Sequence, residues 1–101
     1  MFFEIIGRAA LPDCVDRDDV EDAITAALGS DGEVTGAGTG DGGWHLDVEV
    51  HAAGDPALSA ATIAGTLCRM DLGWVAVRHE SWTDAVPAAQ IRGAVEERAV
   101  P

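Results

Sequence analysis

The sequence predicts an α+β fold in which helices cover one face of an antiparallel sheet. Strand-like and helix-like segments follow one another in the order β-α-β-β-α-β. Residues 45–51 alternate polar and apolar side chains, which is typical of a strand with one buried face. The chain has 101 residues, which indicates one domain that needs a compact two-layer design to bury a core.

The first strand and the first helix are predicted from their apolar patterns and from the residues that begin and end them. Residues 2–9 are apolar and β-prone, and Leu11-Pro12-Asp13 ends this strand. Asp16 or Asp18 caps the helix that follows, and Gly29 stops it. The buried stripe of this helix is expected to contain Val20, Ala23, Ile24, Ala27 and Leu28.

A hairpin is predicted next. Residues 33–37 form the second strand, and the glycine-rich residues 36–43 form a mobile tip that leads into the third strand. In the third strand, alternation directs three apolar side chains to the core and four polar ones to the solvent-exposed face of the sheet. The inward set is Leu46, Val48 and Val50, and the outward set is His45, Asp47, Glu49 and His51.

Asp55-Pro56 marks the start of a second helix that is expected to run to Leu72 and to end at Gly73. Its predicted buried stripe contains Ala60, Ile63, Ala64, Leu67 and Met70. Residues 74–79 form the last strand, and His79 lies on its inward side. We expect residues 1–82 to form the domain, with residues 83–101 as either a short third helix or a frayed tail.

The order of elements, with a hairpin between two crossover helices, resembles the ferredoxin-like split βαβ arrangement. That resemblance implies a four-stranded antiparallel sheet of order 4-1-3-2 with both helices on one face. It covers about residues 1–82 at the level of the fold. It implies no function, because this fold hosts enzymes, regulatory ligand sensors and binding modules.

The chain is strongly acidic, with 18 Asp and Glu against 6 basic residues and a formal charge of −12. Binding to nucleic acid is driven by Lys and Arg that neutralise phosphates, so no nucleic-acid partner is expected. The same negative field speeds the encounter with a basic protein. The alternative is that the acidity only keeps the protein soluble.

No targeting or membrane segment is predicted. Met1-Phe2-Phe3-Glu4 lacks the basic start of a signal peptide, and no run approaches the roughly 18 apolar residues of a membrane span. We therefore expect a cytoplasmic protein that does not contact a membrane. Cys14 and Cys68 lack C-x-x-C spacing, so neither a zinc site nor a disulfide framework is indicated.

The solvent-exposed face of the sheet is the candidate partner-binding surface. Phe2, Ile6 and Trp74 offer apolar anchors among charged side chains, as protein interfaces often do. The alternatives are that the tail covers this face or that a second copy covers it in a homodimer. The predicted partner-binding residues are Glu4, His45, Asp47, Glu49, His51, Trp74 and Arg78.

No cofactor, metal site or catalytic set is expected. His45 and His51 lie six residues apart on a strand, or roughly 20 Å, which is too far to share an ion. The G-x-G-x-x-G pattern of residues 38–43 precedes a strand, whereas a nucleotide site requires a helix there. No nucleophile has a base and an orienting group nearby in the sequence.

The leading hypothesis is a small acidic protein-binding module, such as a bacterial immunity or antitoxin-like inhibitor that masks the basic surface of a toxin. An alternative is a dimeric small-molecule-sensing or regulatory domain of ferredoxin-like type. A third hypothesis is an enzyme that uses His45, Asp47 and Glu49, although we expect a protein that is not an enzyme.

Overall fold

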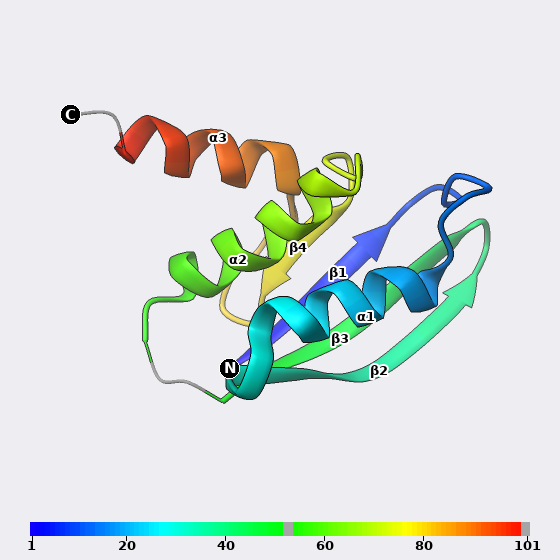
Figure 1. Cartoon of the computed structure of the whole chain (residues 1–101), viewed down its shortest axis with the longest axis horizontal. Helices are drawn as coiled ribbons and strands as arrows, with labels where there is room; N and C mark the ends of the chain where they lie inside the picture. The colour runs from blue at the N-terminus through cyan, green and yellow to red at the C-terminus, as the bar shows by residue number, and fades with distance from the viewer. Residues whose placement is uncertain (52–53, 100–101) are drawn as a thin grey trace.

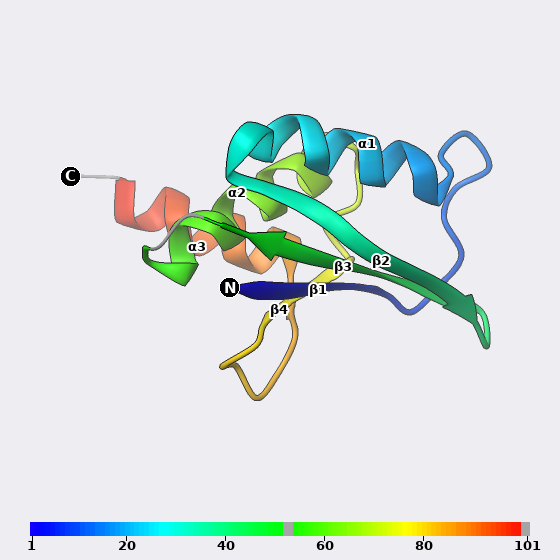
Figure 2. The same ribbon diagram turned by 90° about the horizontal axis from the view of Figure 1, so that it is seen from below.

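The computed structural model describes residues 1–51 and 54–99 and has an α+β fold with one antiparallel sheet (Figure 1). The strand order is β2-β3-β1-β4-β5, and neighbouring strands run antiparallel. Helices α1 and α2 lie on the same side of the sheet (Figure 2). The predicted class, α+β with an antiparallel sheet, is confirmed. No helix in the described part of the chain is long and apolar enough to cross a membrane.

Strand β1 (Phe2–Gly7) leads through a loop into helix α1 (Arg17–Leu28). The cap of α1 is Asp16, whose carboxylate accepts a hydrogen bond from the Asp19 amide at 2.9 Å. The Asp19 carboxylate accepts one from the Asp16 amide at 3.0 Å, which completes a capping box. The helix buries Val20, Ile24 and Leu28 as predicted, whereas Ala27 is exposed.

A short 3-10 turn, η1 (Gly29–Asp31), joins α1 to the hairpin of β2 (Gly32–Gly40) and β3 (Gly43–Val50). The predicted long tip is therefore wrong, because most of the glycine-rich segment is paired strand. The turn itself is Asp41–Gly42, where both residues have positive φ (52° and 77°). A two-residue hairpin turn of this kind requires positive φ, which Asp and Gly tolerate.

Helix α2 (Pro56–Arg69) is capped by Asp55, whose carboxylate accepts a hydrogen bond from the Ala57 amide at 2.9 Å. It ends before the predicted Leu72, because Asp71 takes a left-handed φ of 59°. The Leu72 amide then donates to the Leu67 carbonyl at 2.9 Å, a bond typical of a helix end.

The end of the chain corrects the predicted sheet. Strand β4 (Ala76–His79) begins after Trp74 and Val75, which lie in a turn. In this turn the Val75 amide donates a hydrogen bond to the Leu72 carbonyl at 3.0 Å. Strand β5 (Val86–Pro87) then pairs with β4 and leads into helix α3 (Ala88–Ala99). The sheet therefore has five strands, and the predicted four-stranded order 4-1-3-2 does not account for β5.

Both β5 and α3 are attached to the same core as the rest of the chain. The Ala88 amide donates to the Val75 carbonyl at 2.8 Å, and the Ala88 side chain is fully buried. Helix α3 packs against α2, as Figure 1 shows. The segment after Trp82 therefore covers the outer edge of β4 and one side of α2.

The core lies between the sheet and the helices. Leu46, Val48 and Val50 are buried there as predicted. Trp44, which the prediction did not include, is also buried, and its indole N–H donates to the Ala9 carbonyl at 3.2 Å. Its ring lies so close to Gly7 that a Cβ atom on Gly7 would be 2.1 Å from the indole.

Candidate interaction surface

Strand register arranges the helix-free face of the sheet, called the open face below, in three rows. Residues that pair directly across antiparallel strands share a face, so the register assigns each row. The first row is Glu33, Glu49, Phe2 and Glu80; the second is Gly36, Asp47, Glu4 and Arg78; the third is Gly38, His45, Ile6 and Ala76.

An exposed aromatic ring surrounded by carboxylates marks the first row. Phe2 is 50% exposed, and Glu49 is its partner on β3. Glu33 lies beyond Glu49 on β2, and Glu80 lies on the other side of Phe2. The Glu80 carboxylate accepts from the Phe2 amide at 2.6 Å, and the Glu80 amide donates to the Phe2 carbonyl at 3.0 Å. Phe2 is thus held in place by its backbone while its ring faces solvent.

Glu4 and Arg78 neutralise each other in the second row. Arg78 donates to Glu4 Oε1 through Nε at 3.2 Å and also through Nη2. Its Nη1 donates to the Trp82 carbonyl at 2.9 Å. These two predicted partner-binding residues are therefore brought together, and the pair fixes the turn after β4 to the sheet. The net negative charge of the open face comes from the remaining carboxylates.

Both predicted histidines lie near carboxylates and are about half exposed. His45 Nε2 is 3.9 Å from Asp47 Oδ2. His51, just after β3, has Nε2 at 3.7 Å from Glu33 Oε1 and Nδ1 at 3.8 Å from Glu49 Oε1. These distances exceed those of hydrogen bonds, so neither imidazole is hydrogen-bonded to these carboxylates.

Glycines on β2 flatten the far side of the open face. A Cβ atom on Gly38 would lie 2.3 Å from the His45 ring, and one on Gly36 would lie 2.8 Å from the Asp47 carboxylate. The side chains of His45 and Asp47 therefore extend across the bare backbone of β2. The open face is therefore shallow and polar along β2.

Trp74 lies outside the three rows. It is 43% exposed and occupies the turn before β4, so the prediction that it extends the strand is wrong. On the opposite side of the sheet, His79 is buried between Phe3 and Trp82, with ring centroids 5.0 and 5.9 Å away. Its Nδ1 accepts from the Ser81 amide at 3.1 Å. His79 therefore contributes to packing and not to the open face.

Within residues 1–51 and 54–99, no group of three or more His, Cys, Asp or Glu side chains is placed to hold a metal ion. Cys14 and Cys68 are both free thiols.

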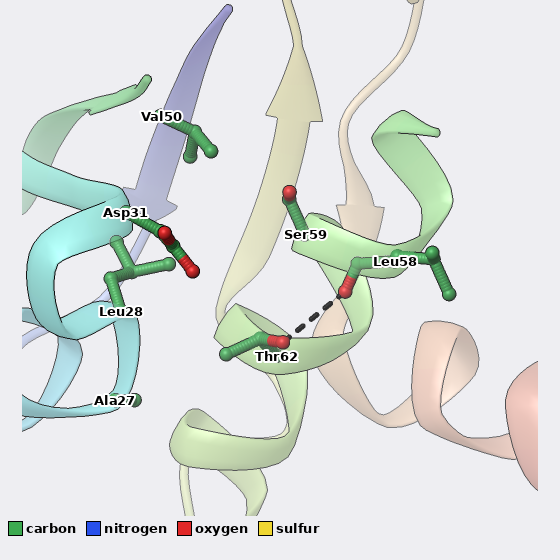
Figure 3. A pocket seen from close by; sticks show the side chains of 7 residues that line it. All are labelled: Ala27, Leu28, Asp31, Val50, Leu58, Ser59 and Thr62. Carbon is green, nitrogen blue, oxygen red and sulfur yellow. Dashed lines mark hydrogen bonds between the residues drawn. The ribbon is translucent and has the colours of Figure 1, made fainter. Parts of the chain in front are cut away.

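A cavity of about 220 Å³ between α1 and α2 offers different chemistry (Figure 3). The Asp31 carboxylate faces across it toward Ser59 and Thr62 on α2. The Thr62 hydroxyl donates to the Leu58 carbonyl at 3.2 Å, and Leu58 is largely exposed at the rim. No hydrogen bond joins the Asp31 carboxylate to the Ser59 or Thr62 hydroxyl among the described residues, so these groups are not arranged as a nucleophile with its base.

No family model matches this chain, and no curated protein or solved structure matches it either. The assignment of function therefore depends on the surfaces and cavities described above.

Proposed function

We propose that this protein is an acidic binding module whose open face docks onto a basic surface of another protein. The observation that supports the proposal is the exposed Phe2 ring between Glu49 and Glu80, with Glu33 beyond. An aromatic anchor within a charged ring is a common centre of protein interfaces, because the aromatic group supplies buried area and the charges select the partner.

The charge of the molecule suits such a partner. A formal charge of −12 accelerates the approach of a basic protein. Glu4 is already neutralised by Arg78, so the other four carboxylates of the open face supply the attraction, namely Glu33, Asp47, Glu49 and Glu80. We infer that the protein acts stoichiometrically in the bacterial cytoplasm, as an immunity or antitoxin-like inhibitor that masks the basic site of a toxin.

The scaffold proposed for this role is of the ferredoxin-like split type, with β5 added beside β4. The proposal is supported by the central antiparallel strands β1, β3 and β4 and by the crossover helices α1 and α2. In such a scaffold the face opposite the helices is available for binding.

The same face is poorly suited to pair with a second copy. Two open faces in contact would enclose two sets of the carboxylates of Glu33, Glu49 and Glu80 in one interface, and these like charges repel each other. We therefore expect light scattering to give the mass of one chain. A dimer that dissociates when Phe2 is replaced by Asp would instead show that a second copy covers this face.

The binding test compares three forms of the protein as bait in a lysate of the source cell. One is the wild type, one carries Glu33→Lys and Glu49→Lys on the open face, and one carries Asp13→Lys and Asp22→Lys. Asp13 and Asp22 are exposed outside the open face, and both replacement pairs change the net charge equally. We expect a basic protein to be captured by the wild type and by the Asp13/Asp22 variant only. Equal capture by all three forms, or the absence of a basic protein, would contradict the proposal.

A further inference from the structure

A second cavity lies where three segments of the chain meet, on the helix side of the sheet. Its volume is about 280 Å³, and its walls come from the loop after β1, the start of α1 and the tip of the β2–β3 hairpin. The lining side chains are Ala10, Leu11, Arg17, Thr39 and Trp44, with Gly42 and Gly43 at the hairpin. Most of this lining is apolar, and Arg17 brings its only charge.

Arg17 has no carboxylate partner within 4 Å among the residues that the structure describes. Its Nη1 donates to the Thr39 hydroxyl, which joins α1 to the hairpin. No ion pair joins it to Asp16 or Asp19, whose carboxylates each accept a hydrogen bond from the backbone of the other in the capping box. Arg17 is therefore a cation that can bind an added anion.

The Nε atom of Arg17 is buried and makes no hydrogen bond. A buried donor without an acceptor is unfavourable, and it is uncommon in folded proteins. Because Nε is enclosed by protein atoms, a ligand in the cavity would reach Arg17 through Nη2, which is not among the enclosed atoms and has no hydrogen bond within the described residues. A carboxylate bound there would accept from Nη2 and supply the missing negative charge.

We propose that this cavity binds a small apolar carboxylate. Arg17 holds the carboxylate, and Trp44, Leu11 and Ala10 contact the apolar body of the ligand. The net negative charge of the protein opposes anions at long range, but screening at physiological salt reduces that opposition beyond about 8 Å. The site is separate from the open face, because Thr39 and Trp44 pair with each other on the helix side of the hairpin.

The test uses phenylacetate as the probe and phenylacetamide as its uncharged analogue, at matched ionic strength. Binding is followed by the NMR signals of the Trp44 indole N–H and the Arg17 Nε–H. We expect saturable shifts of both signals with phenylacetate, at a dissociation constant on the order of 1 mM. The amide should bind roughly 10-fold more weakly or worse, because it lacks the charge that Arg17 requires.

Three variants separate the contributions of charge and space. Arg17→Gln removes the cation and Ala10→Leu fills the cavity, so each should weaken phenylacetate binding roughly 10-fold or more. Arg8→Gln is the matched control, because Arg8 is exposed and lies outside the cavity lining. It should bind phenylacetate like the wild type. The dispersed amide spectrum of each variant verifies that it is folded.

Three results would overturn the proposal. They are the absence of a saturable shift, equal binding by Arg17→Gln and wild type, and shifts that map to open-face residues such as His45. None of these results bears on the basic partner of the open face, so the two proposals succeed or fail independently.

Discussion

At the scale of single residues, close contacts explain positions that the sequence pattern leaves unexplained. Trp44 shares the parity of Leu46, Val48 and Val50, so the inward alternation of β3 extends one step further than predicted. The need for glycine at position 7 follows only from the pairing of Gly7 with Trp44. Strand register, which a single sequence does not specify, brings this glycine under the indole.

Replacing Gly7 with Ala should destabilise the fold by about 1–3 kcal/mol, because the new methyl group overlaps the Trp44 ring. The measurement is the free energy of unfolding in urea. Gly40→Ala is the control, since a Cβ atom at Gly40 has no neighbour within 4 Å. The control should be neutral or gain up to about 1 kcal/mol. Equal stability of Gly7→Ala and wild type would contradict the close packing.

At the scale of elements, helices were easier to predict than strand ends. The Asp16 and Asp55 caps are local signals, and the structure confirms them. The apolar stripes are confirmed in part, because Ala27 of α1 is exposed and Met70 lies beyond the end of α2. Glycine, in contrast, is rare in strands and usually indicates a strand end. The glycines of β2 nevertheless pair with residues of β3, and the pairing continues to Gly40. Strand β5 has two residues, too few to show any alternation, so only tertiary pairing reveals it.

Asp16→Ala should lower the free energy of unfolding by about 0.5–2 kcal/mol, because it removes the side chain that caps α1. Asp22→Ala removes an exposed carboxylate from the middle of the same helix and serves as control. It should change stability by no more than about 0.5 kcal/mol. If both variants lose the same stability, the capping box does not stabilise α1.

At the scale of the whole molecule, the alternation in residues 45–51 correctly separated the core side of β3 from its polar side. The ion pair between Glu4 and Arg78 was not predicted, because cross-strand neighbours depend on register. The position of His51 between Glu33 and Glu49 was missed for the same reason. Trp74 was misplaced because a turn interrupts the apolar run before β4.

The open face and the net charge together predict that binding to the captured basic partner depends on salt. The association rate constant should fall roughly 10-fold or more as ionic strength rises, because salt screens the attraction that guides the encounter. The dissociation rate constant should change much less. Stopped-flow measurements across a salt series give both constants. An association rate that does not respond to salt would show that the acidity has no role in recognition.

The most direct test of the open face is the dissociation constant of the partner complex for Phe2→Ala. Leu58→Ala is the matched control, because Leu58 is an even more exposed apolar residue, on the helix side of the sheet. Isothermal titration calorimetry should show Phe2→Ala binding about 10-fold more weakly or worse, and Leu58→Ala binding like the wild type. If Phe2→Ala binds as tightly as the wild type, the partner does not dock on the open face.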